Sequence, residues 1–122
     1  MARGADIGSP VPFEQLSADE QAIWRVFQPV KDWHSPDLRY EFVFDTANHQ
    51  YQVLRSGWQG LKRLNAILIH IVIRDGYVWV EEDNTELEVA ARLIEEGIPK
   101  DRIVLGFQAP YKRTFEGFAS GQ

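Results

Sequence analysis

The sequence predicts an α+β domain of two layers, in which an antiparallel β-meander sheet packs on helices. Three observations support this class. Segments with the alternation and β-branched content of strands follow one another from about residue 40 to residue 81. The pair Asp75-Gly76 between two of them is typical of a tight hairpin turn. A helical pattern and one more strand, Arg102 to Phe107, come afterwards, and a helix layer over one sheet face is the simplest way to cover that sheet.

The composition is that of one domain. The chain has 122 residues, of which 44% are hydrophobic, and this length suffices for a single core. We expect residues 1–15 to form a flexible or irregular lead-in, because glycines and prolines interrupt its pattern, and residues 16–122 to form the domain. No cysteine occurs, which excludes disulfides, a thiolate nucleophile and cysteine-based zinc sites. With no apolar run of membrane-spanning length, we expect a cytoplasmic protein that makes no contact with a membrane.

The charge balance disfavours a free-standing nucleic-acid-binding protein. There are 13 basic and 18 acidic residues, for a net charge of -5. DNA binding draws most of its affinity from neutralised phosphates. The adjacent basic pairs, Lys62-Arg63 and Lys112-Arg113, stand far apart in the chain. We therefore expect that direct binding of nucleic acid by this chain alone is unlikely.

The first half of the domain reads as one helix followed by three strands. Ser17 and Glu20 have the spacing of a capping box, which predicts a helix from Ala18 to about Gln28. Pro29 is expected to end or disrupt it, because proline lacks a backbone donor. The predicted strands lie around Tyr40 to Phe44, Tyr51 to Trp58 and Ala66 to Ile73, with Leu61 to Leu64 as the connection before the third.

The Asp75-Gly76 turn sets the register of the strands on either side of it. A two-residue turn places Arg74 opposite Tyr77, and the pairing continues to His70 opposite Glu81. The two faces of this hairpin then differ in chemistry. One carries side chains that must be covered, namely Ile69, Ile71, Ile73, Val78 and Val80. The other is amphipathic and carries Leu68, His70, Val72, Arg74, Tyr77, Trp79 and Glu81.

A second helix is predicted after this hairpin. Thr85 and Glu88 have the spacing of another capping box, and Gly97 is suited to end the helix in the left-handed conformation. The expected buried stripe consists of Leu87, Ala90, Ala91 and Ile94.

Several separate blocks of the sequence resemble one known family in order and spacing. The blocks are Tyr51 to Trp58, Leu68 to Trp79, Asp83 to Glu86 and Gly97 to Phe107, followed by Pro110, Arg113 and Gly117-Phe118-Ala119. Together they resemble the XisI family over about residues 40–119. The resemblance implies a control or accessory factor in the programmed excision of a DNA element in cyanobacteria. It also implies a nuclease-like partner, called XisH, or a related two-protein regulatory unit, and it supplies no catalytic residues.

The residues themselves indicate no catalytic, cofactor or metal site. His34, His49 and His70 are far apart and lack the spacing of metal ligands. An acidic cluster, Glu81, Glu82, Asp83 and Glu86, is better explained by the N-terminus of the following helix. No Gly-x-Ser-x-Gly elbow or glycine-rich phosphate loop is present.

Three classes of function therefore stay open. The favoured one is a non-enzymatic regulator that binds a protein, either an XisH-like protein or a second copy of this chain in a homodimer. The alternatives are a DNA-binding recombination accessory protein, and a small-ligand or enzyme module whose site the sequence does not reveal. Large amphipathic side chains carry most interface energy, and the predicted partner-binding residues are Trp58, His70, Tyr77, Trp79, Glu81 and Arg113.

Overall fold

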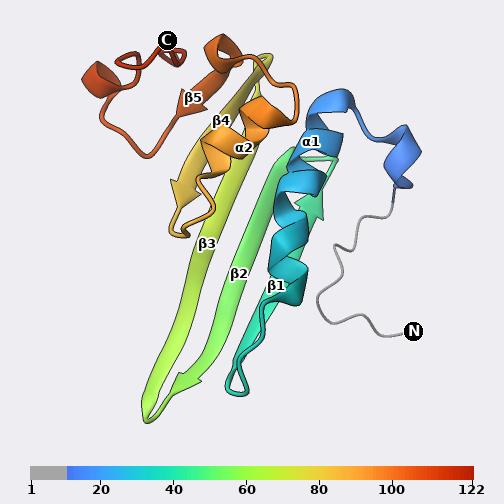
Figure 1. The fold of residues 1–122 in the computed structure, drawn as a ribbon, viewed down its shortest axis with the longest axis vertical. Helices are drawn as coiled ribbons and strands as arrows, with labels where there is room; N and C mark the ends of the chain where they lie inside the picture. Colours follow the sequence, from blue (N-terminus) through green and yellow to red (C-terminus); the bar gives the residue numbers. More distant parts are fainter. Residues whose placement is uncertain (1–10) are drawn as a thin grey trace.

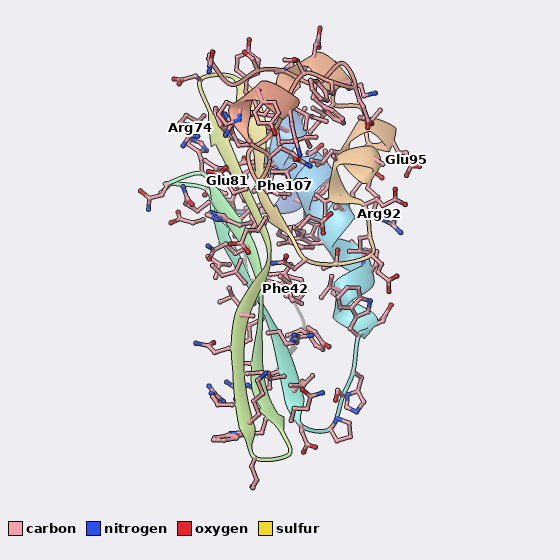
Figure 2. All side chains as sticks on the ribbon, turned by 90° about the vertical axis from the view of Figure 1, so that its left-hand side faces the viewer. Phe42, Arg74, Glu81, Arg92, Glu95 and Phe107 are labelled. Carbon is pink, nitrogen blue, oxygen red and sulfur yellow. The ribbon has the colours of Figure 1, made fainter. Side chains whose placement is uncertain are left out.

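The structure, a computed structural model, describes residues 11–122. Residues 1–10 of the lead-in expected at residues 1–15 therefore lie outside the described residues, and the boundary at residue 16 stays a prediction. A five-stranded sheet has the order β1-β2-β3-β4-β5, antiparallel except for the parallel pair β4–β5. Both α-helices lie against the same face of the sheet (Figures 1 and 2), which confirms the two-layer α+β class. The elements are α1 Ala18–Phe27, β1 Leu38–Asp45, β2 Gln50–Gln59, β3 Lys62–Arg74, β4 Tyr77–Asp83, α2 Val89–Glu95 and β5 Ile103–Leu105.

The start of α1 is the predicted capping box. The Ser17 amide donates to Glu20 Oε1 at 3.0 Å, and the Glu20 amide donates to Ser17 Oγ at 3.1 Å. The same Glu20 side chain is buried and accepts a 2.6 Å hydrogen bond from the hydroxyl of Tyr51 on β2. One carboxylate thus caps the helix and joins it to the sheet. The α-helix ends as predicted, since Pro29 lies in a 3-10 segment that continues the chain from Gln28.

The hairpin between β2 and β3 is longer than the sequence indicates. The predicted connection Leu61 to Leu64 is wrong, because β3 begins at Lys62 and the strands are joined by a tight turn at Gly60 and Leu61. Gly60 adopts φ 64°, a conformation that a tight turn requires and that glycine accepts without strain. The hairpin projects beyond the end of α1, so part of the sheet has no helix over it (Figure 1).

The hairpin between β3 and β4 confirms the predicted turn and most of its register. Asp75 and Gly76 both have positive φ, 55° and 80°. The four predicted pairs from Arg74↔Tyr77 to Ile71↔Val80 are present. The predicted pair His70↔Glu81 is wrong, because a β-bulge after Ile71 shifts the register and places His70 opposite Glu82.

The predicted covered face does form the core. Ile69, Ile71, Val78 and Val80 are fully buried beneath the helices, and Ile73 is partly buried against them. Leu68, which was expected on the opposite face, is buried in the same core. The reason is a second bulge, where β3 slips against Val53 and Leu54 of β2 and alternation is lost.

Helix α2 begins later than predicted and buries a different stripe. Glu88 adopts φ 57°, so the helix begins at Val89 and Thr85 does not cap it. Its core residues are Val89 and Leu93, whereas Ala91 and Ile94, from the predicted stripe, are exposed. Moving the helix start rotates the buried stripe, since residues four apart share a face. The predicted end is confirmed, with Gly97 at φ 104°.

The cap of α2 is the side chain of Asp83, at the end of β4. Its Oδ1 accepts from the Thr85 amide and hydroxyl at 3.1 and 2.7 Å, and its Oδ2 accepts from the Val89 amide at 2.9 Å. Asp83→Ala should lower the free energy of unfolding by about 1–2 kcal/mol, because these donors lose their acceptor. Urea unfolding followed by circular dichroism measures the loss. Glu86→Ala, at an exposed site in the same loop, is the control, and an equal loss in both variants would contradict the capping role.

No helix of the part of the chain that the structure describes has the length and apolar content needed to cross a membrane.

Candidate partner-binding surface

The start of β5 is held by Arg102, which joins three parts of the fold. Its guanidinium bonds Asp19 at the start of α1, with Nη1 3.2 Å from Oδ1 and Nη2 bonded to Oδ2. Its Nε and Nη2 also donate to the Gly76 carbonyl in the β3–β4 turn, at 3.1 and 3.0 Å. The hydrogen bond that the Arg102 guanidinium donates to the Asp19 carboxylate raises the pKa of Arg102. These bonds locate β5, and with it the segment that follows, against β4.

The chain after β5 folds back over the end of the sheet. The Ala119 amide donates to the Ile103 carbonyl at 2.9 Å, so the segment returns beside β5. Gly121, at φ 80°, then lies against Trp79, and a Cβ there would come within 2.7 Å of Trp79 Cη2. The end of the C-terminal segment, residues 106–122, thus reaches the sheet face opposite the helices at Trp79, whereas Phe118 of the same segment packs against the core.

Trp79 is the residue at which the C-terminal segment contacts this face of the sheet. The guanidinium carbon of Arg74 lies 4.2 Å from the centroid of a Trp79 ring, and that of Arg113 lies 5.5 Å away. Arg113 also donates from Nε to the Gln108 carbonyl at 3.1 Å, a hydrogen bond within the C-terminal segment that stabilises its loop. Arg74 in turn lies 4.0 Å from Glu81 across an ion pair. Figure 2 shows Arg74 and Glu81 on the side of the sheet away from the helices.

The structure thus brings together four of the six predicted partner-binding residues. Trp79, Glu81 and Arg113 belong to the cluster just described, and Tyr77 lines a cavity of about 140 Å³ beside it, together with residues 119–122. Trp79 is only partly exposed, however, so it holds the C-terminal segment more than it presents a free surface.

The other two predicted residues lie elsewhere. His70 Nε2 is 2.8 Å from Gln50 Oε1, a contact between β3 and β2 that does not involve Glu81. Trp58 lies near the far end of the β2–β3 hairpin, where it is half exposed and Arg63 lies 5.8 Å from its ring. The six residues therefore do not make one site.

Three aromatic side chains that the sequence analysis did not select are the most exposed in this region. Phe107, Tyr111 and Phe115 have 50%, 70% and 73% of their surface accessible, and we call them the aromatic patch. Figure 2 shows Phe107 at the β4–β5 edge of the molecule. Phe107 was predicted to lie in the strand Arg102 to Phe107, but β5 ends at Leu105, which leaves Phe107 beyond the strand. The signal in the sequence for Tyr111 and Phe115 was their place in a segment without helical or strand periodicity, which leaves them no core to enter.

Two grooves lie beside members of the aromatic patch, one lined by Phe115 and the other by Phe107. One, of about 370 Å³, is lined by Leu105, Gln108, Lys112, Phe115 and Phe118 among others. The second, of about 240 Å³, runs from Phe107 and Phe118 to the start of α2 at Val89. Exposed rings beside apolar grooves, with Lys112, Arg113 and Glu116 at the rim, have the composition of a protein–protein interface.

Residues 11–122 include no group of three or more His, Asp or Glu side chains placed to hold a metal ion. The expectation that the protein is not an enzyme stays a prediction, as does its placement in the cytoplasm.

The fold and sequence match proteins of known structure. A family model described as XisI protein matches residues 13–120. The crystal structure of a XisI-like protein from Anabaena variabilis ATCC 29413 has 33% sequence identity and a TM-score of 0.70, over 83% of this chain and 90% of that one. The crystal structure of the fdxN element excision controlling factor XisI from the same organism has 32% identity and a TM-score of 0.74, over 85% and 96%. No curated protein matches the chain significantly.

Proposed function

The chain belongs to the XisI family, and on that premise we propose that it is a control factor in DNA-element excision, or in a related two-protein regulatory system, that acts by binding a partner protein. One structural relative is an fdxN element excision controlling factor, which supports the excision role. The partner we propose is an XisH-like, nuclease-type protein. In this proposal the chain carries out no reaction of its own.

The observation that carries the proposal is the exposed aromatic patch. Large aromatic side chains left in water are unfavourable, and contiguous patches of them mark interaction sites. Phe107 exposes half of its surface and Phe115 most of its surface, on a segment that is itself anchored through Arg113 and Ala119. A partner that covered both rings would bury them against a framework that is already ordered, so binding would cost little conformational entropy.

Binding of a protein partner, in contrast to binding of DNA, is also compatible with the negative net charge of the chain. The net charge of -5 repels DNA at long range, whereas an apolar patch is insensitive to that charge. A regulator of this kind would reach DNA through its partner. Direct DNA binding by the chain alone would instead fall steeply with salt, because it would depend on released counterions.

We expect the double variant Phe107→Ser and Phe115→Ser to lose co-purification with a co-expressed XisH-like protein. The reason is that buried aromatic anchors each contribute about 2 kcal/mol or more to an interface, so losing two weakens binding by at least about a thousandfold. The measurement is a pull-down through a tag on the partner, followed by titration calorimetry. Circular dichroism of the variant should show an unchanged fold, since both rings are exposed.

Leu61→Ser is the matched control, because Leu61 is fully exposed in the turn between β2 and β3, away from the aromatic patch. It should bind the partner as the unchanged protein does. Equal loss in both variants, or full retention of binding in the double variant, would place the interface elsewhere. Salt-sensitive retention on duplex DNA without any partner would favour the DNA-binding alternative.

A further inference from the structure

A separate groove on the helix side of the sheet contains an arginine that has no partner among the described residues, 11–122. The groove has a volume of about 420 Å³ and lies between Trp33, after the first helix, and the loop that precedes α2. Its lining includes Trp33, Tyr40, Arg55, Leu68, Asn84 and Leu87. It shares no residue with the aromatic patch or with the grooves beside that patch.

Arg55 lies on β2 between Tyr40 of β1 and Ala66 of β3. Its Nε is buried and has no hydrogen-bond partner within residues 11–122, and its guanidinium makes no ion pair there. In the same part of the chain, every other arginine makes a hydrogen bond or an ion pair. A buried donor without an acceptor destabilises a fold, so a group of this kind indicates a bound acceptor that residues 11–122 do not supply.

The chemistry of that acceptor follows from the groove. A carboxylate matches a guanidinium in shape and can accept two parallel hydrogen bonds from it. The rings of Trp33 and Tyr40, packed edge to face with centroids 5.7 Å apart, form an apolar wall, and Leu68 and Leu87 add aliphatic surface. The side-chain amide of Asn84 is already engaged, donating to the Ile67 carbonyl at 3.1 Å and to Glu82 at 2.9 Å.

Charge selects a single carboxylate over a nucleic acid. The exposed Glu86 side chain lines the same groove, and the chain as a whole is acidic. A polyanion would meet repulsion from both along its whole length, whereas a single carboxylate in direct contact with the Arg55 guanidinium would offset its repulsion from Glu86. The groove is open to the surface and not an enclosed cavity, which suits a segment of a protein chain better than a small molecule that must be enclosed.

We propose that this groove binds an acidic peptide segment of a partner protein, with an aspartate or glutamate side chain paired to Arg55 and an apolar neighbour on Trp33 and Tyr40. The site is additional to the aromatic patch and does not depend on the identity of the partner proposed above. In this proposal Arg55 serves to recognise the partner, and its unpaired donor lowers the stability of the free protein.

The test selects peptides from a displayed random dodecapeptide library on the full-length protein. An enriched peptide is then synthesised with a fluorescent label, together with a version in which its acidic residue is replaced by the matching amide. Fluorescence anisotropy gives the dissociation constants for the unchanged protein, for Arg55→Met and for Arg63→Met. Arg63 lies exposed on β3 and its loss makes the same change in net charge, so it is the matched control.

The expected result is that enriched peptides carry an acidic residue beside an apolar one. Arg55→Met and the amide peptide should each weaken binding at least about tenfold, while Arg63→Met leaves it unchanged. The melting temperature of Arg55→Met should equal or exceed that of the unchanged protein, because an unpaired buried donor has been removed. Absence of enriched peptides, enriched peptides without acidic residues, equal binding to Arg55→Met, or a lower melting temperature of that variant would overturn the proposal. Arg55-dependent binding of a duplex oligonucleotide in place of the peptides would overturn it as well.

Discussion

Replacing Leu93 with alanine is expected to lower the free energy of unfolding by about 2–5 kcal/mol, because it leaves a cavity under α2. Leu93 is completely buried and belongs to the same core as Ile69 and Ile71 of β3. The neighbouring change Ile94→Ala is expected to cost less than about 1 kcal/mol, because Ile94 is 37% exposed and points away from that core. The two variants remove side-chain atoms from adjacent positions of one helix, so their difference reports its orientation.

Urea unfolding followed by tryptophan fluorescence measures both variants. The linear extrapolation applies because a small single domain unfolds as one cooperative unit. A loss at Ile94 equal to or larger than that at Leu93 would mean that α2 buries the stripe of Leu87, Ala90, Ala91 and Ile94 that periodicity predicts.

Tyr51→Phe is expected to lower the free energy of unfolding by about 1–3 kcal/mol at neutral pH. The change removes the hydroxyl that donates to Glu20 at 2.6 Å and keeps the ring, which packs edge to face with Phe44 at a centroid distance of 4.8 Å. Glu20 is buried, so its carboxylate then has one acceptor oxygen without this donor. The loss therefore measures the link between α1 and the sheet, with little change in packing.

The stability of the unchanged protein should also depend on alkaline pH through Tyr51. Burial, and then the hydrogen bond to Glu20, raise the pKa of Tyr51 in the folded protein. In the unfolded chain a tyrosine ionises near pH 10. The contribution of Tyr51 is thus fully present below about pH 10 and is lost as the pH rises further, because only the unfolded state then releases the proton, with a slope of about 1.4 kcal/mol per pH unit. Tyr51→Phe should lack this component.

The measurement is a pair of unfolding curves, at pH 8 and pH 11, for the unchanged protein and for each variant. Tyr111→Phe is the control, because Tyr111 is largely exposed and its removal should leave both curves unchanged. If the difference between Tyr51→Phe and the unchanged protein is the same at both pH values, Tyr51 does not have a raised pKa.

Much of the local structure was predictable from short stretches of sequence. The capping box of Ser17 and Glu20, the turn at Asp75 and Gly76 and the helix end at Gly97 each depend on backbone groups within a few residues of one another. A short sequence pattern therefore predicts the hydrogen bonds that form each of these features. The apolar face of the β3–β4 hairpin followed from the same turn, since a known register assigns each side chain to a face.

The candidate sites depended instead on residues far apart in the chain. A bulge separated His70 from Glu81, and the return of Gly121 onto Trp79 partly buried a residue that the sequence suggested as an exposed anchor. The aromatic patch is exposed because no other segment among residues 11–122 covers its rings, and Arg55 is unpaired because no acceptor there reaches its Nε. A local sequence pattern cannot show either absence. The sequence alone indicated the family, through the order and spacing of its matching blocks. It also determined the α+β class and the tight turn at Asp75 and Gly76, because these rest on hydrophobic alternation and on local hydrogen bonding. Only the tertiary structure decided which aromatic and charged groups stay exposed or unpaired, because solvent exposure depends on packing among all the elements.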